Sequence, residues 1–187
     1  GVQTCALPIW NAKPKQFLDI LGTGRSLLQA TYDRFAAVCP TSNIFVVTSA
    51  EYAALTAEQL PDLTPGQILA EPMRKNTAPC IAYAAWHIRS LDPDAVMVVS
   101  PSDHLILQEQ VFQEIILRAA EKADEQDCLI TLGIKPTRPE TGYGYIQFLD
   151  SKAPLKKEKT FTEKPELSIA KTFVESGDFV RSEEHTS

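Results

Sequence analysis

Short apolar runs separated by amphipathic stretches make up most of this chain. Residues 95–99 (AVMVV) are five consecutive apolar residues, and the polar turn 100–104 (SPSDH) ends the run abruptly. A run of this length is typical of a strand buried on both faces rather than of a helix. Further strands are predicted at residues 44–48, 67–70 and 128–133.

The stretches between these strands have helical periodicity. Ser26 and Gln29 have the spacing of a capping box that opens a helix. Leu28, Tyr32 and Phe35 then fall on one face of that helix. Helices are predicted at residues 26–38, 51–60, 77–91 and 111–125. Alternating strands and helices predict an α/β fold with a mostly parallel, doubly wound sheet and helices on both faces.

The pattern changes after residue 133. A segment rich in proline and glycine precedes a strand at 143–149, which is expected to leave the parallel sheet. A lysine-rich loop at 152–159 follows, then a strand at 160–165 and an amphipathic helix at 166–176. These elements follow the predicted parallel core in the chain.

Composition narrows the class of protein. With 187 residues, 44% hydrophobic and 22% charged, the chain has the profile of a globular domain with a real core. A net charge of -6 without a basic stripe argues against nucleic-acid binding. No apolar run approaches the roughly 20 residues of a membrane span. The four cysteines are scattered without metal-site spacing, so reduced thiols and a cytoplasmic location are expected.

Asp103 is the first candidate for chemistry. It follows the apolar run 95–99, and ligands of open α/β sheets gather just beyond the carboxyl ends of the strands. A carboxylate there can hold a divalent cation over a phosphate. The alternative is that Asp103 caps the next helix or closes a turn. Likewise, Glu163 and Lys164 taken alone are most simply an exposed ion pair.

Five motifs occur in the order and spacing of one protein family: PKQFL, EPMRKNTAP, SPSDHLI, GIKPTRPETGYGYI and TEKP. On these motifs the chain resembles the mannose-1-phosphate guanylyltransferases of bacterial GDP-mannose synthesis, from about residue 11 to residue 180. The resemblance implies a Rossmann-like nucleotidyltransferase fold and the use of Mg²⁺. It also implies transfer of GMP from GTP to mannose 1-phosphate, which gives GDP-mannose and pyrophosphate.

The resemblance also implies roles for particular residues. Asp103 would bind the magnesium ion, and Lys15 would contact the nucleotide phosphates. Lys164 would contact the sugar phosphate, and Glu163 would accept hydrogen bonds from mannose hydroxyls. Gly144, which lacks a Cβ, would let the backbone approach the sugar closely.

Base recognition is expected from Glu71 and the turn formed by Asn76, Thr77 and Ala78. The Glu71 carboxylate could accept hydrogen bonds from both N1–H and N2–H of guanine, which adenine cannot offer. Glu71 and Asn76 could instead simply stabilise the loop. Thr77 is also expected to cap the helix that begins there, with Pro79 tolerated in its first turn.

Two features of that family have no counterpart here. The glycine-rich loop that precedes PKQFL, whose amides would hold the triphosphate, is absent. A later metal-binding aspartate is also absent, and residues 1–10 and 181–187 resemble translated adaptor sequence. We therefore expect residues 11–180 to be part of a nucleotidyltransferase domain from a longer enzyme, inactive by itself. Homo-oligomerisation of that enzyme stays open.

Two alternatives remain at this point. A nucleotidyltransferase for another sugar 1-phosphate and another base would share the roles of Lys15, Asp103 and Lys164, although EPMRKNTAP favours the guanylyl type. A non-catalytic domain that binds a nucleotide or nucleotide sugar would bind GTP or GDP-mannose without turnover.

Overall fold

The computed structural model describes residues 13–182, apart from 74–75, 127, 150–152 and 154. The chain divides into two compact units, Gly1–Asp127 (unit 1) and Cys128–Ser187 (unit 2), which are treated separately below. The N-terminal tail at 1–10 lies outside the described residues, as do residues 183–187. No helix in the described part of the chain is long and apolar enough to cross a membrane.

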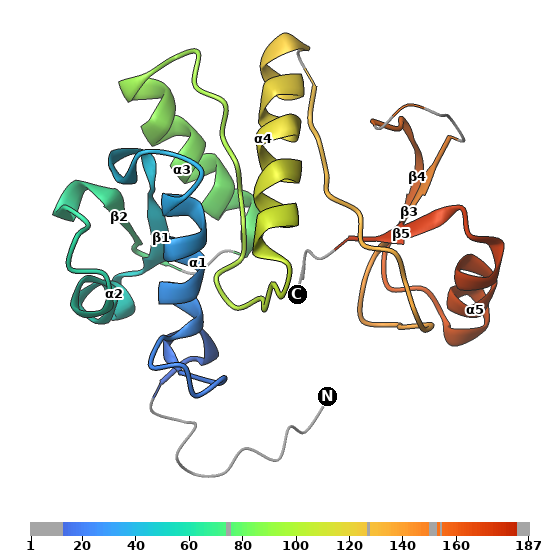
Figure 1. Ribbon diagram of the computed structural model, residues 1–187, viewed down its shortest axis with the longest axis horizontal. Helices are drawn as coiled ribbons and strands as arrows, with labels where there is room; N and C mark the ends of the chain where they lie inside the picture. The colour runs from blue at the N-terminus through green and yellow to red at the C-terminus, as the bar shows by residue number, and fades with distance from the viewer. Residues whose placement is uncertain (1–12, 74–75, 127, 150–152, 154, 183–187) are drawn as a thin grey trace. The chain divides into compact units, whose positions relative to one another are not determined.

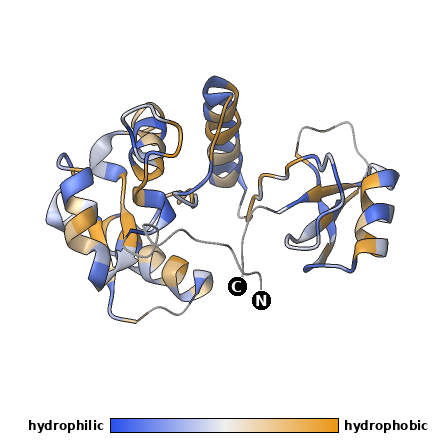
Figure 2. Ribbon diagram, turned by 90° about the horizontal axis from the view of Figure 1, so that it is seen from below, coloured by the Kyte–Doolittle hydropathy of each residue, from blue (hydrophilic) through white to orange (hydrophobic). Residues whose placement is uncertain are grey.

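Unit 1 combines helices with one small parallel sheet (Figure 1). Strands β1 (Val46–Ser49) and β2 (Ile68–Glu71) pair in parallel, with Val46 opposite Ile68. Both strands begin with apolar residues, Val46 and Val47 in β1 and Ile68 and Leu69 in β2, and Figure 2 colours the apolar residues of the chain orange. The helices are α1 (Leu27–Ala36), α2 (Ala53–Gln59), α3 (Thr77–Leu91) and α4 (Glu109–Glu125), with a short 3-10 turn, η2 (Lys15–Phe17), ahead of them.

The predicted capping box opens α1. The Gln29 backbone N–H donates to Ser26 Oγ (3.2 Å), and the Ser26 N–H donates to Gln29 Oε1 (3.0 Å). Two orphan amides at the helix start are thereby satisfied. Leu28 and Tyr32 on the predicted face are buried, and Phe35 meets Phe112 of α4 edge-on at 5.9 Å between ring centroids.

The core of unit 1 lies between η2, α1 and the segment that follows α2. Its buried residues are Phe17, Leu28, Tyr32, Leu60 and Leu63. Half-buried residues of β1 and β2, Val46 and Ile68, pack against this cluster. The small sheet is therefore attached to the helices through the same core.

The α/β class is confirmed, but two predicted buried strands are not present. Residues 95–99 form no strand, and Val96, Val98 and Val99 are 40–51% exposed. Residues 128–133 also form no strand, and Leu129 is fully exposed. The apolar runs predicted a need for burial, but no strand among the described residues pairs with either run. The described strands therefore form two small sheets instead of one broad parallel sheet.

The start of α3 also differs from the prediction. Asn76 precedes the helix as N-cap, with φ +66°, and Thr77 is its first residue. Asparagine tolerates positive φ better than most residues, which explains its place at this corner. Pro79 lies in the first turn of the helix, as predicted, where its missing N–H costs nothing.

Unit 2 is an antiparallel sheet with one helix. Strands β3 (Tyr145–Phe148), β4 (Glu158–Thr162) and β5 (Phe179–Arg181) have the order β4-β3-β5. Helix α5 (Leu167–Ser176) ends at Gly177, whose φ of +75° is typical of a helix C-terminus. The predicted strand that leaves the parallel sheet, the second strand and the amphipathic helix after residue 133 are all present, and the structure adds that the strands pair antiparallel.

The core of unit 2 centres on Tyr145, which is fully buried. Its hydroxyl donates to the Glu140 carbonyl (3.0 Å) and accepts from the Glu140 N–H (2.9 Å). Its ring lies 5.5 Å from Phe173 of α5, which in turn stacks on Phe179 at 4.0 Å. Ser182, in the C-terminal tail defined from the sequence, is buried and donates its N–H to the Gly144 carbonyl (3.0 Å).

We predict that Gly133→Ala destabilises unit 2. A Cβ at this position would lie 2.6 Å from the Val180 Cβ and 2.2 Å from its Cγ2, so the β5 backbone would have to shift. Such overpacking typically costs about 1–3 kcal/mol. Urea unfolding followed by the fluorescence or circular dichroism of unit 2 measures this change. Gly142→Ala is the matched control, because nothing lies within 4 Å of a Cβ there. Equal unfolding midpoints for the two variants would contradict the prediction.

Candidate active site

The turn η2 begins with Lys15 and is anchored in the core by its last residue, Phe17. Phe17, the last residue of η2, is 4% exposed and packs against the Tyr52 ring at 5.7 Å. Lys15, the first residue of the same turn, is exposed. The buried aromatic ring thus fixes the backbone of the turn and leaves the ammonium group able to reach a ligand.

Asp103 lies in the turn that follows the apolar segment 95–99, which has no regular secondary structure. Lys15 Nζ is 3.5 Å from Asp103 Oδ2, so the structure brings together two residues that are 88 positions apart. His104 Nε2 lies 3.7 Å from Asp103 Oδ1. The N-cap of α4 is Gln108, which excludes the alternative that Asp103 caps this helix. Asp103 is therefore a turn residue with its carboxylate accessible between two basic side chains.

Glu71 is the last residue of β2, and its carboxylate affects a neighbouring thiol. Burial raises the pKa of the Cys80 thiol, and the negative charge of Glu71 raises this pKa further. Cys80 belongs to the first turn of α3, so Glu71 and the start of α3 are close in space. Asn76, Thr77 and Ala78 lie at that helix start, where backbone N–H groups favour acceptor groups of a ligand. Glu71 is thus near Cys80, in the helix turn that begins with Thr77 and Ala78.

Glu163 and Lys164 follow β4 in unit 2. Lys164 Nζ lies 3.5 Å from Glu163 Oε1, and both side chains are a little over one third exposed. Lys164 has a φ of +40°, a conformation that non-glycine residues rarely adopt. Strained backbone of this kind is concentrated at ligand-binding sites.

Gly144 has a packing reason in this structure that the sequence did not reveal. It is buried, and a Cβ there would lie 2.5 Å from Cζ of Phe161 and 2.8 Å from Ser182 Oγ. The absence of a side chain therefore lets the Phe161 ring cover the backbone.

The described residues contain no group of three or more His, Cys, Asp or Glu side chains that could enclose a metal ion. A single accessible carboxylate still fits Mg²⁺, which is usually bound by one or two carboxylates together with substrate phosphates and water. Asp103 is the accessible carboxylate at this position, with 38% of its side chain exposed. Closed ligand cages of the zinc type are a different kind of site.

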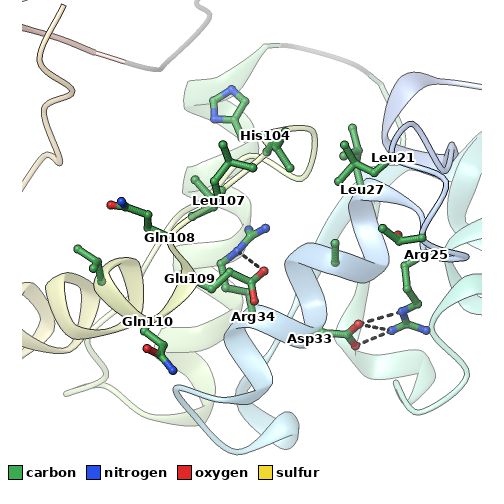
Figure 3. A pocket seen from close by; sticks show the side chains of 15 residues that line it. Leu21, Arg25, Leu27, Asp33, Arg34, His104, Leu107, Gln108, Glu109 and Gln110 are labelled. Atoms are coloured by element: carbon green, nitrogen blue, oxygen red, sulfur yellow. Dashed lines mark hydrogen bonds and ion pairs between the residues drawn. The ribbon is translucent and has the colours of Figure 1, made fainter.

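Beside His104, unit 1 has an open groove with a volume of about 680 Å³ (Figure 3). Arg34 lines this groove and is only 3% exposed. Its Nε lies 3.6 Å from Glu109 Oε1, so the two groups form an ion pair, but the distance is too long for a hydrogen bond. Burial lowers the pKa of Arg34, and Glu109 opposes this change. No sequence motif indicated this buried arginine, because its partner lies on a different helix.

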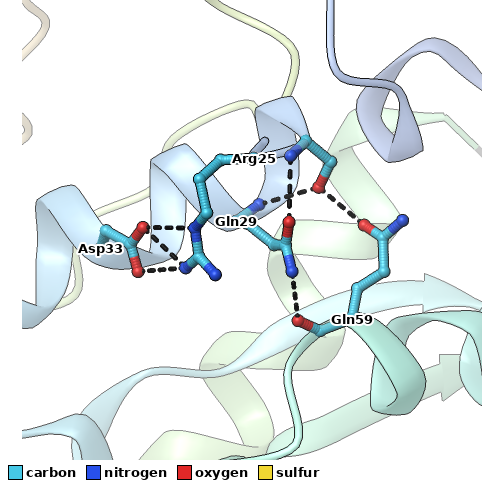
Figure 4. A network of polar contacts seen from close by, with 5 residues as sticks. Arg25, Gln29, Asp33 and Gln59 are labelled. Carbon is cyan, nitrogen blue, oxygen red and sulfur yellow. Dashed lines mark hydrogen bonds and ion pairs between the residues drawn. The ribbon is translucent and has the colours of Figure 1, made fainter. Parts of the chain in front are cut away.

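A second feature missed from the sequence is a set of polar contacts around Gln59, at the end of α2 (Figure 4). Gln59 Nε2 donates to the Phe17 carbonyl (3.0 Å), and Gln59 Oε1 accepts from Ser26 Oγ (2.6 Å). The Gln29 side chain donates to the Gln59 carbonyl (2.9 Å). These contacts join the turn of Lys15 to the start of α1.

Comparison with known families places residues 4–185 in the family described as Nucleotidyl transferase. Among curated proteins, the chain is 45% identical over 168 residues to the xanthan biosynthesis protein XanB of Xanthomonas campestris pv. campestris (strain B100). It is 38% identical over 172 residues to the mannose-1-phosphate guanylyltransferase of Klebsiella pneumoniae. Each match covers 89% of this chain, but only 35% and 36% of the relatives, so the chain spans about a third of their length.

Two solved structures share the fold. The crystal structure described as mannose-1-phosphate geranyltransferase from Thermus thermophilus matches with a TM-score of 0.79 and 29% identity, over 90% of this chain and 48% of that one. The structure of mannose-6-phosphate isomerase from Helicobacter pylori matches with a TM-score of 0.76 and 31% identity, over 90% of this chain and 64% of that one. The arrangement of elements is therefore that of a known α/β nucleotidyltransferase fold.

The reactivity of Cys80 reports on Glu71. Since the Glu71 carboxylate raises the thiol pKa, Glu71→Gln should lower that pKa, increase the thiolate fraction and speed alkylation by iodoacetamide at pH 8. Labelling rates should be measured with the other three cysteines replaced by Ser. Glu58→Gln, at an exposed position of α2, is the control. Burial remains the larger cause, so reaction should stay slower than for a free thiol. An unchanged alkylation rate of Cys80 in Glu71→Gln would contradict the proximity of Glu71 to the start of α3.

Proposed function

Since the chain belongs to the nucleotidyl transferase family, we propose that it forms part of an enzyme that transfers GMP from GTP to mannose 1-phosphate. The products are GDP-mannose and pyrophosphate. Similarity to curated mannose-1-phosphate guanylyltransferases, at 36–38% identity over 89–90% of the chain, supports this assignment. Because the chain spans about a third of those relatives, the activity is proposed for a longer protein that contains it.

The reaction joins two anions. A phosphate oxygen of mannose 1-phosphate forms a bond to the α-phosphorus of GTP, and the bond from that phosphorus to the bridging oxygen breaks as pyrophosphate leaves. The protein therefore contributes mainly positioning and neutralisation of charge. Cationic side chains and carboxylates that can hold a divalent cation are the groups that this chemistry requires.

The ion pair between Lys15 and Asp103 is the structural observation that carries the proposal. It puts a cation and an accessible carboxylate 3.5 Å apart in the turn that follows segment 95–99. In the proposed complex, Asp103 would hold Mg²⁺, which supplies charge neutralisation at the phosphates. When substrate binds, Lys15 would leave Asp103 and contact the nucleotide phosphates. Asp103 would then be bound to Mg²⁺ instead of Lys15.

Specificity is proposed to divide between the two units. In unit 1, Glu71 would accept hydrogen bonds from guanine, and the start of α3 at Asn76, Thr77 and Ala78 would line the base. In unit 2, Lys164 would pair with the sugar phosphate and Glu163 would contact the mannose. Gly144 would contact the mannose once the Phe161 ring that covers it moves aside. The proximity of Glu71 to α3 and the positive φ of Lys164 support these roles.

The proposal extends to the surroundings of the site. In the longer protein, the exposed apolar segment 95–99 of unit 1 would join further strands in a wider, mostly parallel, doubly wound sheet. Residues 11–180 would then form one part of the catalytic domain. A cytoplasmic location agrees with nucleotide and sugar-phosphate substrates.

Removing the charge of Asp103 should impair catalysis in the full-length enzyme. Asp103→Asn keeps the size of the side chain but weakens its hold on Mg²⁺. Loss of one such electrostatic group typically lowers kcat by about 10²–10³-fold. Pyrophosphate release from GTP and mannose 1-phosphate, measured across a Mg²⁺ titration, tests this. Asp124→Asn, at a position of α4 outside the site, is the matched control. Unchanged turnover and Mg²⁺ dependence in Asp103→Asn would reduce Asp103 to a turn residue.

Base and sugar recognition should be separable by mutation. Glu71→Gln should weaken the use of GTP and leave the KM for mannose 1-phosphate unchanged, since a site built to hydrogen-bond a group discriminates strongly. Lys164→Ala should raise the KM for mannose 1-phosphate by contrast. Steady-state kinetics with each substrate varied in turn, and with ATP as competing nucleotide, measure both effects. Swapped effects would overturn the assignments, and ATP use equal to GTP use by the unmodified enzyme would favour a nucleotidyltransferase for another base.

A further inference from the structure

We propose that Gln59 is a positioning residue for Lys15, holding the turn that presents the Lys15 ammonium group. The inference uses the role of Lys15 at the nucleotide phosphates, and in that respect it rests on the proposed function. Gln59 lies in none of the motifs from which the site was predicted. It lies at the C-terminal end of α2, 44 positions after Lys15.

The Gln59 side chain uses both ends of its amide. Its Nε2 donates to the carbonyl of Phe17 (3.0 Å), and its Oε1 accepts from Ser26 Oγ (2.6 Å). Ser26 Oγ already accepts from the Gln29 N–H (3.2 Å), so the Ser26 proton points to Gln59. Since the Ser26 hydroxyl and the Phe17 carbonyl need an acceptor and a donor respectively, the side chain at position 59 must offer an N–H group to Phe17. A carboxylate cannot supply one.

The Phe17 carbonyl belongs to the same short turn as Lys15. Phe17 N–H donates to the Pro14 carbonyl (3.0 Å), and the Leu18 N–H donates to the Lys15 carbonyl (3.1 Å). A three-residue turn closed in this way moves as one piece. Holding the Phe17 carbonyl therefore also holds the backbone of Lys15.

The ion pair between Lys15 and Asp103 cannot by itself fix the position of the Lys15 ammonium group. Both Lys15 and Asp103 are substantially exposed, and exposed pairs contribute little because solvent screens them and two long side chains must be ordered. The position of the ammonium group must come from the backbone below it. Two anchors supply that position: the buried Phe17 ring and the Gln59 amide at the Phe17 carbonyl.

The chain offers a matched control in Gln67. Its Nε2 donates to the carbonyls of Thr41 (2.7 Å) and Ile44 (2.9 Å), and the residue is buried. Gln67→Glu and Gln59→Glu both replace an amide donor by a carboxylate facing backbone carbonyls, so both should lower stability. The hydrogen bonds of the Gln67 amide go to the Thr41 and Ile44 carbonyls and not to η2, so only Gln59→Glu removes a hydrogen bond from the turn of Lys15.

Steady-state kinetics of the full-length enzyme give the first readout. We expect Gln59→Glu to raise the KM for GTP about tenfold, since small misplacements of a binding group cost about that much or more, and to leave the KM for mannose 1-phosphate unchanged. Gln67→Glu should change neither KM. Gln59→Met, which keeps the side-chain length without burying a charge, should act in the same direction as Gln59→Glu if the latter fails to fold.

A second readout does not depend on activity. Lysines are dimethylated with ¹³C-formaldehyde and a borane reductant, and the Lys15 signal is identified by its loss in Lys15→Arg. In the wild type and in Gln67→Glu, this signal should shift when Asp103→Asn removes the ion-pair partner; in Gln59→Glu or Gln59→Met that shift should be lost. Failure of the wild type to convert GTP would overturn the proposed function while this measurement still tests Gln59. Equal effects of the Gln59 and Gln67 variants, or a Lys15 signal unaffected by Gln59→Met, would overturn the positioning role.

Discussion

Burial of the Phe17 ring is the constraint on which the rest of unit 1 depends. The ring comes from a three-residue turn with no strand or long helix to hold it, yet it is 4% exposed among Leu28, Tyr32 and Leu60. Removing such a side chain from water contributes about 1.5–3 kcal/mol. The same contact joins α1 to the segment after α2, so the helices and the turn of Lys15 share one core. The exposed ammonium group of Lys15 is thus placed by an apolar group two residues away.

Sequence reasoning succeeded where structure is decided by neighbouring residues. The capping box of Ser26 and Gln29 and the helix at Thr77–Leu91 depend on local hydrogen bonds and periodicity, which can be read from the chain. The apolar runs 95–99 and 128–133 were different, because a strand exists only with a partner. Apolar residues predict that burial is favourable, but they do not specify which segment provides it, and the described chain supplies no partner strand for either run. The N-cap of α3 was misassigned because the choice depends on the positive φ of Asn76, not on hydrogen-bonding capacity alone.

The candidate site shows a similar division. Motifs indicated Lys15 and Asp103 separately, but only the fold shows that they lie within 3.5 Å of each other. The ion pair between buried Arg34 and exposed Glu109 could not be predicted from the sequence, since charged residues on amphipathic helices are ordinarily exposed. Gly144 was interpreted through a ligand, whereas the Phe161 ring and Ser182 provide a packing reason for the same glycine. Residues that organise a site through backbone carbonyls, as Gln59 does, are the hardest to find, because neither their identity nor their spacing is distinctive.

The outer strand of unit 2 has a consequence for association between chains. β4 lies at the edge of the β4-β3-β5 sheet and is almost entirely exposed, so its outward backbone groups could template another strand. Its register with β3 is interrupted between Gln147 and Phe148, and charged Glu158 and Lys159 occupy its first positions. Lys156 also covers the Phe148 ring at 4.0 Å. A distorted edge with charged side chains pairs poorly with a strand of another chain, so the β4 edge is unfavourable for amyloid-like growth.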